Sequence, residues 1–325
     1  MTRPVKRLSP IDLVEAFHLG HAVAALHELD VFPRPGKPVA ARQLARKHRL
    51  DPAMLAGMLE YVAARTALLK KGKRGFTATA EYSAASRFLL DLYLGAFGGT
   101  ARQLPTLLRD PSSAPRSVDR KRHARAFEKI GTAAPGPVLR VVEQLGLNHV
   151  LDIGCGSGAL LLQLAARNPD FRGWGLETNP SMRMVARRNI SAARAGKRIR
   201  LLAGGTSHLR ALDSIGPSVQ AVTACQVANE MFSAGTDRAV AWLRQLKKTF
   251  PGRPLLVSDY YGRLGRRGGG DRMTLLHDFV QLTSGQGVPP ASRQEWQAIY
   301  SKAGCRLVHA VEARGSTWFV HIVAL

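Results

Sequence analysis

The chain has 325 residues, of which 45% are hydrophobic, and its 47 Lys and Arg against 23 Asp and Glu give a formal net charge of +24 at pH 7. This length suits two domains, and no apolar run approaches the roughly 18 residues of a membrane-spanning helix. The widely spaced Cys155, Cys225 and Cys305 form neither a disulfide framework nor a metal-ligand pattern, which predicts a cytoplasmic protein without a metal. The basic charge would attract nucleic acid, but basic residues spread along the chain are equally typical of an arginine-rich surface.

The N-terminal part predicts a mainly helical domain with a short strand. Ser9 and Pro10 suit an N-cap and a first helical position, and apolar residues recur at helical spacing from Ile11 to Leu29. Further elements are expected as helices over residues 39–48, 51–69 and 82–97, a turn over 70–75 and a strand over 76–79. Helices followed by a hairpin are typical of a winged-helix domain. A loop over residues 109–115, rich in Pro and Ser, predicts a linker and hence domains 1–115 and 116–325.

A glycine-rich turn dominates the second domain. Val150, Leu151 and Ile153 predict a short buried strand, and residues 159–166 are dense in helix formers. Between them lie glycines at positions 154, 156 and 158, which suit a tight turn that a ligand approaches closely. The spacing differs from the Gly-x-Gly-x-x-Gly dinucleotide fingerprint, and Asp152 would repel a pyrophosphate. The stretch therefore favours a cationic ligand.

An acidic residue stands at the end of the next predicted strand. Residues 171–176 form this strand, and Glu177 follows it, in the position where a carboxylate can accept hydrogen bonds from both ribose hydroxyls of a bound nucleoside. Asn179 and Pro180 then begin a helix that extends to Ala195.

The rest of the chain alternates strands and helices. This pattern predicts an α/β fold of the Rossmann-like, doubly wound type with a mostly parallel seven-stranded sheet. The further strands are expected over residues 198–202, 218–223, 254–258, 305–311 and 317–323, and the helices over residues 124–145, 237–250, 271–284 and 292–303.

The run Leu-Asp-Ile-Gly-Cys-Gly-Ser-Gly over residues 151–158 resembles the first motif of class I S-adenosylmethionine-dependent methyltransferases. The N-terminal part is similar to small-molecule O-methyltransferases of the plant and bacterial polyketide type, in residues 29–31, 41–45, 51–55 and 76–79. This resemblance implies S-adenosylmethionine as the cofactor and a homodimer whose N-terminal domain covers the active site. The implied cofactor-binding residues are Asp152, Gly154, Cys155, Gly156, Gly158, Glu177, Thr178, Thr206 and Gln226.

The resembled family carries a His-Asp pair after the fourth strand, and its histidine is the general base. Here Asn229 and Glu230 occupy that position, and an asparagine cannot accept a proton at pH 7. Glu230 is therefore one candidate base. His277, which precedes Asp278 on the predicted helix after the fifth strand, is the other, because a histidine pKa lies near neutrality.

The acceptor pocket is predicted from position alone. Tyr260 and Met273 are expected to contact a flat, apolar acceptor together with His277 and Asp278. A carboxylic acid acceptor would need no base, because it is already ionised at pH 7 and Arg272 can hold it. After the third strand, Thr206 is expected near the adenine.

These observations predict O-methylation of a small aromatic, polyketide-like or carboxylic acid metabolite. Two alternatives remain at this stage. An RNA methyltransferase would account for the charge of +24. A winged-helix regulator with a ligand-sensing domain would account for the N-terminal pattern, although its third predicted helix carries few basic residues.

Overall fold

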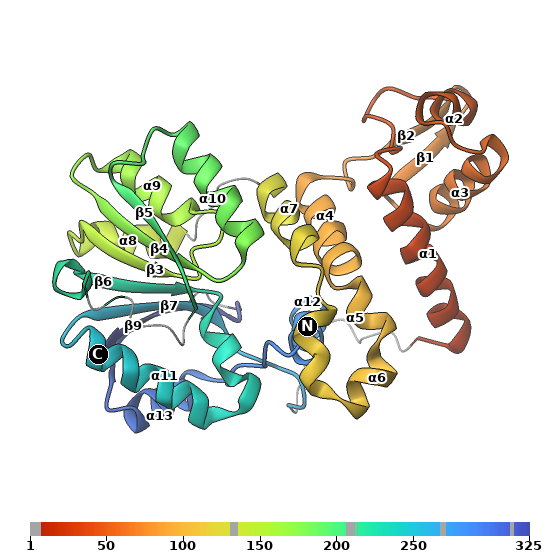
Figure 1. Cartoon of the computed structure of the whole chain (residues 1–325). Coiled ribbons are helices and arrows are strands. Elements are labelled where there is room, and N and C mark those ends of the chain that lie inside the picture. The colour runs from red at the N-terminus through yellow and green to blue at the C-terminus, as the bar shows by residue number, and fades with distance from the viewer. Residues whose placement is uncertain (1–7, 131–135, 206–211, 213, 267–270, 313–314) are drawn as a thin grey trace. The chain divides into compact units, whose positions relative to one another are not determined.

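The computed structural model describes residues 8–130, 136–205, 212, 214–266, 271–312 and 315–325. The chain divides into two compact units, Met1–Ala96 and Phe97–Leu325 (Figure 1). The sequence predicted a later boundary, at residue 115. The Thr100 Oγ1 lies 2.7 Å from the Ser117 Oγ, and Ala114 and Pro115 pack against Gly285. These contacts join residues 97–117 to the second unit.

The first unit follows the predicted order of helices and hairpin. Its elements are α1 (Pro10–Glu28), α2 (Ala41–His48), α3 (Pro52–Arg65), β1 (Leu69–Gly72), β2 (Gly75–Ala78), α4 (Ala84–Leu89) and a π-helix over Leu90–Ala96. The Ser9 side chain accepts a hydrogen bond from the Asp12 amide, and the Asp12 carboxylate accepts one from the Ser9 amide. This capping box begins α1 where Ser9 and Pro10 predicted it.

One boundary in this unit differs from its prediction. The helix expected to reach Leu69 ends at Arg65, and Lys70 and Lys71, expected in a turn, belong to strand β1. Leu69 is buried and pairs with Ala78 in the antiparallel hairpin. Burial of Leu69 in the small core therefore outweighs the helical spacing that continued through residues 66–69.

Short helices lead into the sheet of the second unit. They are α5 (Gly98–Arg102), α6 (Leu104–Arg109), a 3-10 helix over Pro111–Ser117, α7 (Arg120–Ile130) and α8 (Gly136–Gln144). Residues 109–115, expected as a loop, are thus largely helical. None of the helices in the described part of the chain is long and apolar enough to cross a membrane.

The predicted seven-stranded sheet is confirmed. Its strands are β3 (His149–Ile153), β4 (Arg172–Glu177), β5 (Ile199–Ala203), β6 (Ala221–Cys225), β7 (Pro254–Tyr260), β8 (Arg306–Glu312) and β9 (Trp318–Ala324). They lie in the order β5-β4-β3-β6-β7-β9-β8, and β9 is antiparallel to β7 and β8. The helices between them are α9 (Ala159–Arg167), α10 (Pro180–Ala192), α11 (Thr236–Thr249), α12 (Arg272–Thr283) and α13 (Arg293–Lys302). The strand order changes direction at β3 and β6, the position where open α/β sheets bind ligands.

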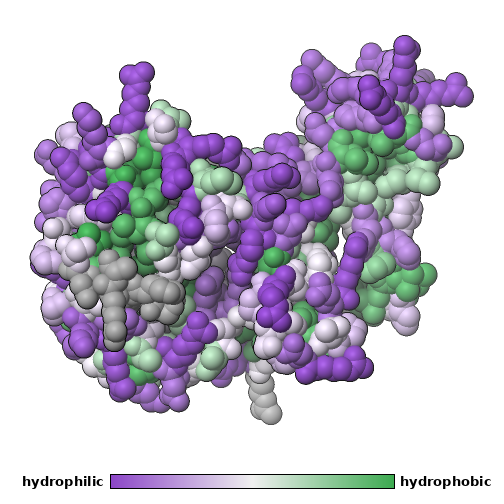
Figure 2. All heavy atoms as spheres, in the orientation of Figure 1, coloured by the Kyte–Doolittle hydropathy of each residue, from purple (hydrophilic) through white to green (hydrophobic). Residues whose placement is uncertain are grey.

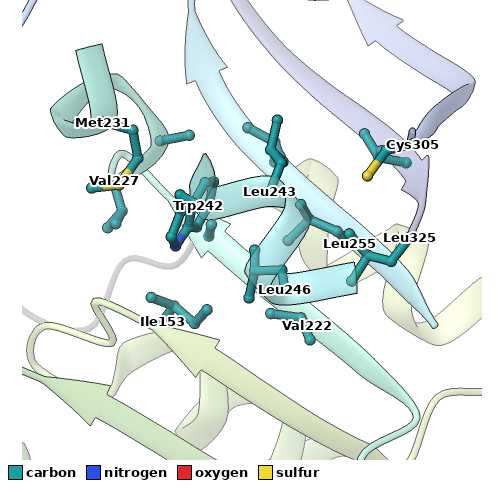
Figure 3. Close-up of a cluster of buried hydrophobic side chains, with 14 of the residues drawn as sticks. Ile153, Val222, Val227, Met231, Trp242, Leu243, Leu246, Leu255, Cys305 and Leu325 are labelled. Carbon is teal, nitrogen blue, oxygen red and sulfur yellow. The ribbon is translucent and has the colours of Figure 1, made fainter. Parts of the chain in front are cut away.

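A buried apolar cluster holds α11 against one face of the sheet. Leu243 and Leu246 from α11 lie close to Val222 of β6 and Leu255 of β7 (Figure 3). Burial of one leucine side chain of this kind contributes roughly 1.5–3 kcal/mol. The cluster fixes the central strands, so that their carboxyl ends form one rigid edge.

Candidate active site

The glycine turn lies between β3 and α9, as the sequence predicted. Gly154, Gly156 and Gly158 have φ angles of 67°, 55° and 77°, in the left-handed region that favours glycine. The Gly154 amide donates a hydrogen bond to the Leu176 carbonyl oxygen at 2.7 Å. A Cβ atom at Gly154 would lie 2.3 Å from the Cγ2 of Val227. The turn therefore needs glycine both for its conformation and for space.

Glu177 connects this turn to the end of β4. Its Oε2 accepts a hydrogen bond from the Gly156 amide at 3.1 Å, and its Oε1 accepts one from the Asn179 amide at 2.8 Å. The Thr178 hydroxyl also donates to Oε1, at 3.4 Å. A carboxylate can accept about four hydrogen bonds, so a pair of ribose hydroxyls would use the remaining place on Oε2 and replace the Thr178 contact on Oε1. The geometry supports the predicted ribose-binding role, which stays a prediction.

Asp152 is a buried carboxyl group directly below the turn. Only 3% of the residue is exposed, and its Oδ1 accepts a hydrogen bond from the Thr223 hydroxyl at 2.7 Å. Burial raises the pKa of Asp152 to about 7, against the lowering effect of this hydrogen bond, and the charge of Glu177 raises it further. A cation close to this carboxyl group would favour its ionised form.

The other predicted cofactor residues differ in what they can offer. The Cys155 side chain is buried and packs beside Gly175, so only its backbone can face a ligand. The exposed Thr178 directly follows Glu177. Gln226 directly follows β6 and has a φ of 56°, and its amide donates to the Ser258 carbonyl oxygen. This strained conformation at a strand end is typical of functional sites. Thr206 lies outside the described residues.

A short 3-10 helix over Ala228–Ala234 follows β6 and carries Asn229 and Glu230. The Asn229 amide donates to the Asp259 Oδ2 at 2.9 Å, whereas the buried Asn229 Oδ1 has no hydrogen-bond partner in the described structure. Burial raises the pKa of Glu230 and raises that of Asp259 to about 7. Asp259, which the sequence marked only as a strand end, therefore anchors the start of this 3-10 helix.

His277 lies at the carboxyl end of β7, the same edge of the sheet as the glycine turn. Its ring centroid is 4.9 Å from that of Tyr260 and 6.2 Å from that of Trp318. Two strand spacings, about 10 Å, separate β7 from β3. Burial lowers the pKa of His277, which keeps the imidazole neutral at pH 7, the state that a general base needs. Trp318 was not predicted, because it begins a strand distant in sequence.

Two predicted acceptor residues have other contacts. Tyr260 is buried and packs against the rings of His277 and Trp318. Asp278 is fully buried, and its Oδ2 accepts hydrogen bonds from the amides of Arg263 and Leu264. This oxygen holds the loop after β7, and the predicted contact of Asp278 with a substrate stays a prediction.

Met273 keeps a position suited to the acceptor. It lies four residues before His277 on α12, so the two side chains share one face of the helix. The residue is 40% exposed. A flexible, polarisable thioether beside aromatic rings suits a flat apolar ligand.

Comparisons with known proteins agree with this geometry. Residues 150–249 match the family model of the methyltransferase domain. The chain is 26% identical over 177 residues to methyltransferase ungE' of Aspergillus campestris (strain IBT 28561), and the matched region covers 51% of each chain. It is 46% identical over 68 residues to the release factor glutamine methyltransferase of Burkholderia pseudomallei (strain K96243). This matched region covers 20% of this chain and 24% of that protein. The chain thus spans about half the length, or less, of these curated relatives.

Solved structures match over nearly the whole chain. The mitomycin 7-O-methyltransferase MmcR has a TM-score of 0.75 at 18% identity, covering 97% of this chain and 96% of its own. A second match is the O-methyltransferase NcsB1 from neocarzinostatin biosynthesis, solved in complex with S-adenosylmethionine and 2-hydroxy-5-methyl naphthoic acid. Its TM-score is 0.71 at 18% identity, and the match covers 99% of this chain and 100% of that one. Human N-acetylserotonin methyltransferase has a TM-score of 0.72 at 16% identity, with 99% of both chains covered. At these identities the likeness shows the fold.

Proposed function

We infer that this chain, whose residues 150–249 form a class I S-adenosylmethionine-dependent methyltransferase domain, transfers a methyl group from S-adenosylmethionine to an oxygen atom of a small aromatic or polyketide-like acceptor. The observation that carries this proposal is the hydrogen bond between the Gly156 amide and the Glu177 carboxylate. This hydrogen bond links the glycine turn, which a ligand can approach closely, to a carboxylate that can still accept hydrogen bonds. The nucleoside part of the cofactor requires both features.

The residues of the turn fit the cofactor chemically. Glu177 would accept hydrogen bonds from the ribose hydroxyls, and the buried carboxyl group of Asp152 would favour the positive end of the cofactor. The cofactor supplies an electrophilic methyl group on a sulfonium. A Cβ at Gly154 would displace Val227, so the turn keeps its shape only with glycine at this position. The protein itself must align the acceptor oxygen and exclude water.

On the acceptor side we assign the proton transfer to His277. The Gln281 side-chain nitrogen lies 3.2 Å from the His277 Nε2. A neutral imidazole at the carboxyl end of β7 can take the proton of an acceptor hydroxyl at this nitrogen when the hydroxyl replaces the Gln281 contact, while the oxygen gains the methyl group. Asn229 cannot take that proton, but its unpartnered Oδ1 can accept a hydrogen bond from a second hydroxyl of the acceptor. Met273 and the ring of Trp318, against which the buried Tyr260 packs, suit a planar acceptor.

We further propose that the protein is a homodimer formed through α1. Ile11 is 71% exposed and Phe17 is 58% exposed, and Leu13 and Val14 are also exposed on the first half of this helix. Figure 2 shows hydrophobic side chains gathered there. A contiguous exposed apolar surface of this kind marks a protein interface.

Size-exclusion chromatography with light scattering tests the dimer. Phe17→Asp should yield a monomer, because a charge would be buried in the interface. Met54→Asp is the matched control, since Met54 is equally exposed on α3, and it should leave the dimer intact. A wild-type protein that elutes as a monomer at micromolar concentration would refute this assignment.

The function is tested by measuring cofactor binding and methyl transfer separately. Titration of S-adenosylmethionine should show binding to the wild type and to His277→Gln, and loss of binding in Glu177→Ala. Methyl transfer should then be followed with a panel of phenols and carboxylic acids. Transfer to phenols should fall by about 10²–10⁴-fold in His277→Gln, the usual contribution of a general base. Unchanged transfer in this variant would remove His277 from the mechanism. Failure of the wild type to bind the cofactor would overturn the proposed function.

A further inference from the structure

A concave site lies at the end of the sheet opposite the glycine turn. It is a groove of about 800 Å³ at the amino ends of β3, β4 and β5, bordered by the end of α10. Figure 1 shows these strands and α10 side by side. The volume falls in the range of roughly 300–1,000 Å³ that small-molecule sites occupy. The groove is formed entirely by the second unit.

The groove is strongly basic. Arg172, Arg187, Lys197 and Arg200 are exposed along it, and its lining includes no Asp or Glu. Within the described part of the chain, none of these four side chains forms an ion pair. Arg198 also lines the groove, and its guanidinium donates hydrogen bonds to the carbonyl oxygens at the end of α9. Concentrated positive charge without a carboxylate partner favours an anion.

An aromatic surface accompanies this charge. Trp174 is only half-buried although it lies in the interior of the sheet, and it pairs in register with Arg200 of β5. The ring of His149 lies 6.2 Å from the Trp174 ring in an edge-on contact. A tryptophan face beside arginines is a surface on which a planar base stacks while its phosphate meets the cations.

The groove is separate from the methyl-transfer site. Arg172 begins β4 and Glu177 ends it, so about 17 Å of extended strand lies between the groove and the ribose-binding carboxylate. A single nucleotide held in the groove would therefore not reach the transferred methyl group.

We propose that this groove is a second binding site for a nucleotide, whose base stacks on Trp174 and whose phosphates contact Arg172 and Arg200. The shared chemistry, a phosphate ester that carries a planar aromatic base, is found in free nucleotides and in single-stranded nucleic acid. The site does not depend on the proposed methyl transfer, because it is defined by binding alone.

Isothermal titration of the full chain with ATP, hexauridylate and inorganic tripolyphosphate tests this site and identifies the source of the nucleotide. The double variant Arg172→Gln, Arg200→Gln should bind nucleotide at least tenfold more weakly, since each hydrogen bond to a charged group contributes about a factor of ten in affinity. Trp174→Leu, which keeps the apolar packing and removes the aromatic face, should weaken binding by about tenfold. Lys248→Gln is the matched control, because it removes an exposed charge on α11 and should change nothing.

The outcomes separate the possible ligands. Binding of ATP alone would identify a free nucleotide, whereas tighter binding of hexauridylate with a steep salt dependence would identify a single strand. Equal weakening in Lys248→Gln would show attraction to overall charge and overturn the site. Equal binding of tripolyphosphate, with no effect of Trp174→Leu, would show an anion site without base recognition and overturn the proposal. Binding of S-adenosylmethionine should be unchanged in all variants, which shows that each is folded.

Discussion

Replacing Asp152 with asparagine should remove the contribution of this carboxyl group to the pH dependence of S-adenosylmethionine binding between about pH 6 and pH 8. The wild-type carboxyl group has a pKa of about 7 because it is buried. Its negative charge favours a cationic ligand, so binding should strengthen as the pH rises through 7. The asparagine side chain has no charge at any pH, and it keeps an oxygen that can accept the Thr223 hydrogen bond.

The magnitude follows from the fraction of Asp152 that is ionised. With a pKa of about 7, this fraction is roughly 0.1 at pH 6 and roughly 0.9 at pH 8. If the cofactor binds only the ionised form, its association constant rises about tenfold over this range, which corresponds to about 1.4 kcal/mol. Binding at pH 6 should release close to one proton per cofactor.

Isothermal titration in buffers of different ionisation enthalpy measures both the affinity and the proton release. Any titration of the cofactor itself is the same for both proteins, so the ratio of their affinities isolates Asp152. Thr223→Val gives a second check. The Thr223 hydrogen bond lowers the pKa of Asp152, so its loss should move the midpoint of the affinity curve to higher pH. A tenfold pH dependence that persists in the Asp152→Asn variant would refute the reasoning and point to another acid.

Two further predictions concern the turn and the fold beneath it. Gly154→Ala should abolish cofactor binding and lower the thermal stability of the protein. Adding Val227→Ala should restore only part of that stability, because it removes the clash with the Cγ2 but not the strain of a φ of 67°. Full recovery of thermal stability in the double variant would contradict this. Asp259 has a pKa of about 7 in the folded protein, against roughly 3.9 in the unfolded chain, so folding favours its protonated form. Its contribution to the free energy of unfolding is therefore fully present below about pH 4 and is lost as the pH rises through 7. The difference in stability between wild type and Asp259→Asn, measured by urea denaturation, should therefore decrease over that range, and a difference that grows with pH would be inconsistent with the raised pKa.

The cofactor half of the site could be predicted from the sequence because its information is local. Three glycines within five residues force a left-handed turn, and the acid that faces this turn ends the next strand along the chain. Alternation of strands and helices then fixes which strand ends lie together. The hydrogen bond between Gly156 and Glu177 follows from these two facts.

The domain boundary and the role of Asp278 could not be predicted in the same way. Residues 109–115 have the composition of a loop, but their packing against Gly285 is a contact between segments distant in sequence. Asp278 follows His277 on a helix, and only the position of the amides of Arg263 and Leu264 decides that its carboxylate points to them. Tertiary contacts, which leave no local pattern, determined both outcomes.

The acceptor side is built from such contacts, and they bear on which acceptor it selects. Gly287 packs tightly against the backbone of the 3-10 helix that carries Asn229, and its amide donates to the Gln281 carbonyl oxygen. The side-chain oxygens of Asn229 and Gln281 are both buried, and neither has a hydrogen-bond donor among the described residues. Each such oxygen costs roughly 1–3 kcal/mol, which a ligand hydroxyl other than the one methylated would offset and an ionised carboxylate would not. With His277 neutral and able to take the released proton, this arrangement favours hydroxyl-bearing acceptors over carboxylic acids.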